Sequence, residues 1–197
     1  MAKKGKFVVF EGIDGAGSTT QLLLLHNYLK KKKIPVVKTA EPTSGPIGKR
    51  IRGILQGKEK IDAKEFQLLY CQDREEHLKK QIIPALASGK TVLCDRYYFS
   101  TIAYGSLKLD YKWLVSICAG FLRPDVTFLV NTPAKVAMER MKSRREKELF
   151  EKEKLLEKVG KAYLKLMKTD KSCFILTGTK SKQEIFTDVL KVLKYDK

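Results

Sequence analysis

Two glycines and two hydroxyl side chains near the start of the chain have the spacing of a phosphate-binding loop. Gly12 and Gly17 enclose four residues, and Ser18 and Thr19 follow directly. In the pattern Gly-x-x-x-x-Gly-Lys-Ser/Thr, the glycines let backbone N–H groups converge on phosphate oxygens at the start of a helix, and the final hydroxyl binds Mg²⁺. We therefore predict phosphate binding by Gly12, Ile13, Asp14, Gly15, Ala16, Gly17, Ser18, Thr19 and Thr20.

The lysine of this pattern is missing, because Ser18 stands in its place. The loop therefore lacks the ammonium group that stabilises charge on the β- and γ-phosphates during phosphoryl transfer. By analogy with the removal of one preorganised donor, the loss costs about 10²–10³ in rate unless another cation compensates. Taken alone, the segment is compatible with nucleotide binding and with a glycine turn that binds nothing.

An acid and an arginine follow the apolar segment 91–94, where a buried strand is expected to end. Ligands of open parallel sheets bind at the carboxyl ends of the strands. Asp95 offers oxygen ligands for Mg²⁺, and the Arg96 guanidinium can pair with a phosphate. Without the phosphate loop, a surface salt bridge would be the simpler interpretation. With it, we predict Thr19 and Asp95 as metal ligands.

The elements that must position these side chains alternate along the chain. Short β-rich segments occur near residues 6–10, 35–39, 91–94, 125–131 and 173–177. Longer helical patterns lie between them. This alternation predicts an α/β fold with a parallel sheet flanked by helices.

Three helical features are specific enough to test. Helices are expected over residues 19–33 and 62–88, the second with a disturbance near Pro84. Thr132 precedes a proline at the first turn of a further helix and is a candidate N-cap. The charged stretch that follows, about residues 141–150, has few apolar residues and is predicted to be a mobile lid.

Length and composition favour one intracellular domain. The 197 residues contain no linker-like tract, so we expect a single domain over residues 1–197. No apolar run is long enough to span a bilayer, and the first residues lead straight into a strand, so a cytoplasmic protein without membrane partners is expected. The four cysteines are scattered, which suggests neither zinc nor a disulfide framework.

The net charge of +18 favours polyanionic partners, which include nucleotides and nucleic acids. The lysines are spread along the whole chain rather than gathered in one arm. This distribution favours a solvated basic surface, so we predict no nucleic-acid partner. A basic nucleic-acid-binding protein remains the rival class, and it would show a steeply salt-dependent affinity.

Four motifs in order carry a family resemblance over nearly the whole chain. The sequence resembles the thymidylate kinases, which are P-loop nucleoside monophosphate kinases, and the matching residues are Phe10 to Gly17, Glu41-Pro42 with Ile47-Gly48 and Ile51-Arg52, Leu68 to His77, and Asp95 to Tyr104. The resemblance implies a five-stranded parallel sheet of the P-loop NTPase fold and a homodimer. It also implies transfer of the γ-phosphoryl group of ATP to dTMP, with Mg²⁺ as cofactor.

The resemblance also assigns the acceptor residues. It places the thymine base on the ring of Tyr70, Arg74 beside the acceptor nucleotide, and Ser100 as a hydrogen-bond partner of the base. Tyr104 would crowd the position of a ribose 2′-hydroxyl, and Asp14 would lie near the acceptor sugar and phosphate. The full set of implied dTMP-binding residues is Glu41, Pro42, Arg52, Tyr70, Arg74, Arg96, Ser100 and Tyr104.

On the donor side, the resemblance places the adenine against Arg140 and makes Arg144 and Arg145 lid cations that close on the phosphates. Ala16 agrees with this, because family members without an arginine in the loop carry basic residues in the lid. The implied catalytic residues are Asp14, Asp95, Arg96, Arg144 and Arg145.

Three residues depart from the family pattern. Ser18 replaces the loop lysine, Ala40 replaces an arginine before Glu-Pro, and Gly105 replaces a larger residue, often Gln, after Ala-Tyr. The first affects the expected rate and the other two affect acceptor recognition. Two alternatives therefore stay open: a deoxynucleoside monophosphate kinase that also accepts dUMP or other acceptors, and a catalytically impaired nucleotide-binding protein.

Overall fold

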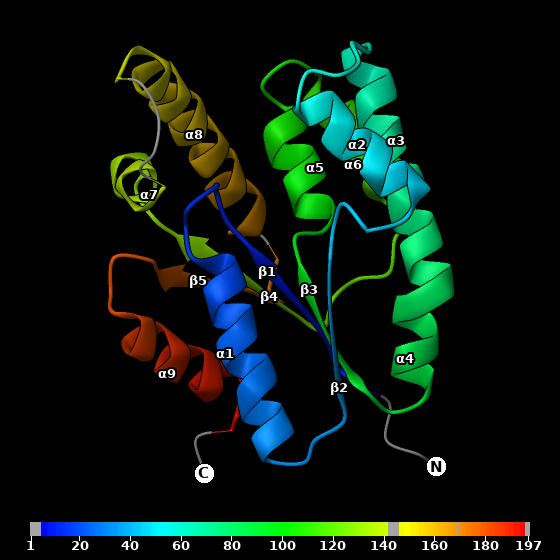
Figure 1. The fold of residues 1–197 in the computed structure, drawn as a ribbon. Helices are drawn as coiled ribbons and strands as arrows, with labels where there is room; N and C mark the ends of the chain where they lie inside the picture. The colour runs from blue at the N-terminus through cyan, green and yellow to red at the C-terminus, as the bar shows by residue number, and fades with distance from the viewer. Residues whose placement is uncertain (1–4, 142–145, 169, 196–197) are drawn as a thin grey trace.

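The computed structural model describes residues 5–141, 146–168 and 170–195, and within these residues it contains one parallel sheet. The strand order is β2-β3-β1-β4-β5 (Figure 1). The strands are β1 (Phe7–Glu11), β2 (Val36–Ala40), β3 (Thr91–Asp95), β4 (Val126–Asn131) and β5 (Cys173–Thr177). The predicted five-stranded parallel sheet is confirmed, with every strand within about one residue of its expected bounds.

Helices cover the sheet and rise above the carboxyl ends of its strands. In Figure 1, α2, α3, α5 and α6 gather at the upper right, and α7 and α8 at the upper left. No helix among the described residues is long and apolar enough to cross a membrane. The helices are α1 (Ser18–Lys31), α2 (Pro46–Leu55), α3 (Ala63–His77), η1 (Leu78–Ile82), α4 (Ile83–Ala87), α5 (Tyr98–Gly105), α6 (Tyr111–Cys118), α7 (Ala134–Arg140), α8 (Glu146–Met167) and α9 (Lys182–Leu193).

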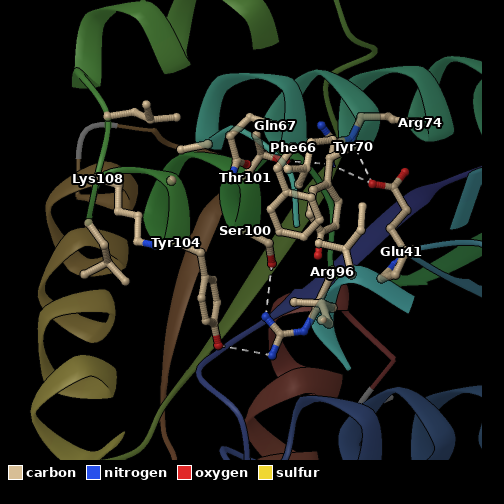
Figure 2. A pocket seen from close by; sticks show the side chains of 18 of the residues that line it. Glu41, Phe66, Gln67, Tyr70, Arg74, Arg96, Ser100, Thr101, Tyr104 and Lys108 are labelled. Atoms are coloured by element: carbon tan, nitrogen blue, oxygen red, sulfur yellow. Dashed lines mark hydrogen bonds and ion pairs between the residues drawn. The ribbon is translucent and has the colours of Figure 1, made fainter. Parts of the chain in front are cut away.

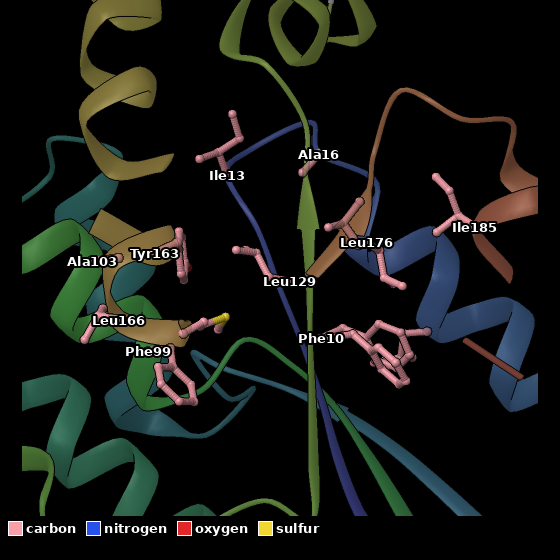
Figure 3. Close-up of a cluster of buried hydrophobic side chains, with 14 of the residues drawn as sticks. Phe10, Ile13, Ala16, Phe99, Ala103, Leu129, Tyr163, Leu166, Leu176 and Ile185 are labelled. Carbon is pink, nitrogen blue, oxygen red and sulfur yellow. The ribbon is translucent and has the colours of Figure 1, made fainter. Parts of the chain in front are cut away.

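The central strand β1 is buried on both faces, as expected for a parallel sheet covered by helices. Val8 and Phe10 belong to the larger core cluster, which includes side chains of α1, α5, α8 and α9 (Figure 3). Phe7 and Val9 point to the other face and pack with Leu78 and other side chains of η1 and α4. This two-sided burial fixes the position of the loop that follows β1.

The expected helix 62–88 is present with the predicted disturbance. Asp62 caps α3, since its carboxylate accepts a hydrogen bond of 2.8 Å from the Lys64 backbone N–H. After α3 the helix continues as the wider π-helical segment η1, and the α-helical geometry returns in α4, which begins one residue before Pro84. Proline has no N–H, and its ring crowds the carbonyl four residues earlier. This explains why the α-helical hydrogen-bond pattern becomes π-helical in the turn before Pro84.

The expectation that Thr132 caps the next helix is wrong. The N-cap position of α7 is taken by Pro133, and no side chain caps it. The hydroxyl of Thr132 instead donates a 2.9 Å hydrogen bond to the backbone carbonyl of Ala16 in the phosphate loop. The sequence pattern could not indicate this, because the end of β4 and the loop after β1 meet only in the folded sheet.

Candidate active site

The phosphate loop joins β1 to α1 in a conformation that glycine permits. Gly15 and Gly17 have φ values of 81° and 103°, a region that other residues rarely adopt. A Cβ at Gly15 would also lie 2.4 Å from the carbonyl oxygen of Ala137. Gly17 occupies the N-cap of α1 and no side chain caps that helix, so its first N–H groups remain available to an anion.

The two predicted metal ligands meet at the mouth of this loop. Thr19 Oγ1 donates a hydrogen bond to Oδ2 of Asp95, and Ser18 Oγ lies 3.4 Å from Oδ1 of the same carboxylate. The contact arises because β1 and β3 are neighbours, with Phe10 paired to Asp95. A hydroxyl and a carboxylate are the hard oxygen ligands that Mg²⁺ prefers, so these residues fit a magnesium site.

Arg140 links the phosphate loop to the turn after β5. Its Nη1 donates to the Ala16 carbonyl at 3.1 Å and its Nη2 donates to the Gly178 carbonyl at 2.8 Å. The guanidinium therefore lies beside the loop, where the adenine of a donor nucleotide was expected. The two other predicted donor-side cations, Arg144 and Arg145, lie outside the described residues.

Arg96 is held by side chains of the phosphate loop and of α5. It has a left-handed backbone with φ 69°, directly after β3. Its Nη2 forms a 2.8 Å ion pair with Asp14 Oδ1, and its Nη1 donates to Ser100 Oγ at 3.2 Å. The guanidinium carbon lies 5.3 Å from the centre of the Tyr104 ring. The structure thus brings together four predicted site residues from the phosphate loop, the β3 end and α5.

Glu11 and Tyr163 are two residues of this site to which the sequence analysis gave no role. Glu11 is completely buried; its Oε1 accepts from the N–H groups of Tyr97 (2.8 Å) and Ser100 (3.3 Å). Its Oε2 contacts the hydroxyls of Ser100 (2.6 Å) and Tyr163 (2.9 Å). Tyr163 comes from α8, 152 positions later. The one available signal for Glu11 was an acid at the end of an otherwise apolar strand.

Burial raises the pKa of Glu11 to about 7, although the Ser100 hydroxyl and the Arg96 charge favour its ionised form. Because the folded-state pKa exceeds the ordinary value of 4.5, the folded protein binds this proton more tightly than the unfolded chain. The stability that this proton contributes is present below pH 4.5 and is lost as the pH rises through about 7. The Glu11→Gln variant should remove this loss.

In that variant, the amide oxygen can accept from the two N–H groups, and the NH₂ can donate to the two hydroxyls, where the protonated acid has a single O–H to donate. We compare the free energy of unfolding of the variant with that of wild type at each pH. This difference should be more favourable to the variant at pH 8 than at pH 4.5, by up to roughly 3 kcal/mol. Urea unfolding at both pH values measures this. The exposed Glu75→Gln variant is the control, and an identical pH dependence in Glu11→Gln and wild type would contradict the assignment.

A cavity of about 670 Å³ opens beside Arg96, between α2, α3 and α5 (Figure 2). This size suits a small organic ligand. Tyr70 lines the cavity, and its ring contacts that of Phe66 edge to face with centroids 5.2 Å apart. Burial raises the pKa of Tyr70 to about 12, so the phenol is neutral. The predicted acceptor residues that line the cavity are Glu41, Pro42, Tyr70, Arg74, Arg96, Ser100 and Tyr104, together with Asp14.

Arg74 is a buried cation rather than half of an exposed pair. Its Nε donates to Glu41 at 2.8 Å and its Nη2 donates to Thr101 at 3.0 Å. His77 Nδ1 lies 3.1 Å from the second oxygen of Glu41. Among the described residues, Nη1 of Arg74 has no hydrogen-bond partner, and this atom is shielded from solvent. Arg74 as a residue lines the cavity, and because buried guanidinium donors are normally paired, its unpaired donor favours a ligand with an acceptor atom that reaches Arg74.

Two predicted acceptor residues have their polar groups engaged elsewhere. Ser100 lines the cavity, but its hydroxyl contacts Glu11, which as a buried carboxylate needs donors. Arg52 is not among the cavity-lining residues, and its Nη1 donates to the carbonyl of Pro42 at 2.9 Å. It therefore supports the loop that carries Glu41.

Comparison with known proteins agrees with this geometry. The family model for thymidylate kinase matches residues 10–189. The chain is 38% identical to a probable thymidylate kinase of Pyrococcus horikoshii over 98% of both chains, and 40% identical to one of Methanocaldococcus jannaschii over 95% of both. It is 42% identical to a thymidylate kinase of Desulfotalea psychrophila over 79% of both. The phosphate loop, the β3 acid and arginine, and the cavity beside them lie within the matched residues, and the chain belongs to the thymidylate kinase family, which consists of ATP-dependent phosphotransferases.

Proposed function

We propose that the protein transfers the γ-phosphoryl group of ATP to dTMP, giving dTDP and ADP for dTTP biosynthesis. The observation that carries this is the cavity that joins Tyr70 and Arg74 at one end to Arg96 at the other. Nη1 of Arg74 is buried and has no partner in the described part of the chain. An aromatic face suits a planar base, and a donor without a partner suits a carbonyl oxygen of that base. Arg96 suits the phosphate that receives the transferred group.

In this proposal, the protein acts by positioning and by neutralising charge, which is most of what phosphoryl transfer requires. The acceptor phosphate takes up Nη donors of Arg96, while Asp14 keeps that guanidinium in place. The loop N–H groups bind the donor phosphates. Thr19 and Asp95 would hold Mg²⁺, which neutralises charge on the donor phosphates when it is bound.

The charge of the missing loop lysine has to come from other residues. We propose that Arg144 or Arg145 of the predicted lid supplies it, together with Arg96. The support is the sequence itself, because these arginines follow Arg140, whose guanidinium lies beside the phosphate loop.

A coupled ADP-release assay tests the function, with Mg-ATP as donor and with dTMP, dUMP, dGMP or ribothymidine 5′-monophosphate as acceptor. We expect turnover with dTMP, with kcat/KM at least about tenfold above that for dUMP, because a buried methyl group contributes about 1–3 kcal/mol to discrimination. Equal values for dTMP and dUMP would favour the broader kinase. No turnover in wild type together with activity in Ser18→Lys would favour the catalytically impaired binding protein. The names of the relatives support neither alternative.

Partners and location belong to the same proposal. Leu68 of α3 and Tyr111 and Val115 of α6 are exposed apolar side chains on two helices that pack together. They support a homodimer formed through these helices. We also propose that the protein acts in the cytoplasm and binds ATP and dTMP rather than nucleic acid.

A further inference from the structure

The cavity wall formed by α3 carries a glutamine whose amide makes no hydrogen bond to the part of the chain that the structure describes. Gln67 lines the cavity and is only 8% exposed. Its amide has no hydrogen-bond partner within residues 5–141, 146–168 and 170–195, although its polar atoms are not completely shielded. An amide that loses contact with water without gaining a partner is destabilising. A ligand in the cavity can provide that partner.

Gly105 explains why the amide reaches this place. A Cβ at Gly105 would lie 2.7 Å from Leu114 Cδ2, 3.1 Å from Leu114 Cδ1 and 3.3 Å from the amide carbon of Gln67. The opposite wall, α5, therefore has no room for a side chain at this position. The amide of Gln67 takes the space that a larger residue in place of Gly105 would need.

Gln67 lies on the same side of α3 as the two residues proposed to hold the base (Figure 2). Tyr70 and Arg74 follow it by three and seven residues, which places all three on one face of the helix. The rise of an α-helix separates the Cα atoms of Gln67 and Arg74 by about 10 Å. Gln67 and Arg74 thus lie on either side of Tyr70 along the same face of α3 (Figure 2).

We propose that Gln67 is a further base-binding residue, which donates a hydrogen bond to the C2 carbonyl of the acceptor pyrimidine, on the opposite side of N3 from the carbonyl nearer to Arg74. A pyrimidine with two carbonyls has one on each side of N3, which matches two groups that approach from opposite sides. The inference rests on the proposed function, since it needs a thymidylate in this cavity. It assigns to Gln67 a contact with the base that Gly105, which has no side chain, cannot provide.

Steady-state kinetics of Gln67→Leu tests the proposal, with Gln72→Leu as a matched control on an exposed position of the same helix. We expect Gln67→Leu to raise KM for dTMP about fivefold to tenfold, the equivalent of one neutral hydrogen bond. KM for ATP and kcat should stay within twofold. KM for dUMP should rise by the same factor, because dUMP carries the same C2 carbonyl. Gln72→Leu should leave every constant unchanged.

Gln67→Glu separates recognition from packing. A carboxylate has nearly the same shape but cannot donate a hydrogen bond when ionised, so KM for dTMP should rise more than in Gln67→Leu. An unchanged KM for dTMP in both variants would overturn the proposal, and so would a parallel rise in KM for ATP, which indicates general damage to the fold. Wild-type turnover in the same assay reports separately on the proposed function: its absence would reject that function itself.

Discussion

Arg96→Ala is expected to lower kcat for dTMP phosphorylation by about 10³-fold or more, in the range found for arginines that stabilise transferring phosphoryl groups. Arg96 is the one described cation that contacts Asp14 of the phosphate loop through an ion pair and also lines the acceptor cavity. With Ser18 in the lysine position, the site depends more heavily on its remaining cations. Single-turnover measurements with dTMP at saturating Mg-ATP report the chemical step directly.

Arg96→Lys and Arg123→Ala complete this experiment. Lysine keeps the charge but cannot reproduce the two-pronged contact to Asp14 and Ser100, so we expect it to recover only part of the lost rate. Arg123 is exposed and does not line the cavity, so its removal should leave kcat unchanged. A kcat in Arg96→Ala within tenfold of wild type would show that another cation serves the acceptor phosphate.

Arg74→Met is expected to reduce stability by about 3–5 kcal/mol, because it leaves the buried carboxylate of Glu41 without its cation. The side chains of both residues are at most 3% exposed, so water cannot replace the lost partner. His77 Nδ1 lies 3.1 Å from the other oxygen of Glu41 and can donate a hydrogen bond to it, but a hydrogen bond from a neutral imidazole does not replace the lost positive charge. Urea unfolding at pH 8 measures the effect.

The double variant Arg74→Met with Glu41→Gln tests the cause. It removes both charges, and we expect it to be more stable than Arg74→Met alone, because the remaining buried group is neutral. Arg50→Met breaks an exposed ion pair with Glu59 and should change stability by less than about 1 kcal/mol. If the double variant is no more stable than the single variant, the loss comes from packing around Arg74 rather than from an unpaired charge.

Patterns along the chain were enough for the architecture. Alternating apolar segments predicted the five strands because each strand of a covered parallel sheet must be apolar, and the glycine spacing predicted the loop after β1. The contact between Asp95 and Thr19 could also be expected. Asp95 ends one central strand, and Thr19 lies in the helix that follows another. The lid residues Arg144 and Arg145 lie outside the described part of the chain and stay predictions.

The amino-acid sequence by itself determined the fold class, the family and the identity of most candidate site residues, because these depend on local periodicity and on motifs read in order. Only the tertiary structure decided their partners. Glu11 accepts a hydrogen bond from Tyr163 of a distant helix, Arg74 donates to Glu41, and the Thr132 hydroxyl donates to the phosphate loop. The tertiary structure also placed Gln67 in the cavity wall, where its amide has no partner among the described residues. Contacts between residues far apart in the chain depend on how helices and strands pack, and burial then determines which charge or hydrogen-bonding group needs which partner.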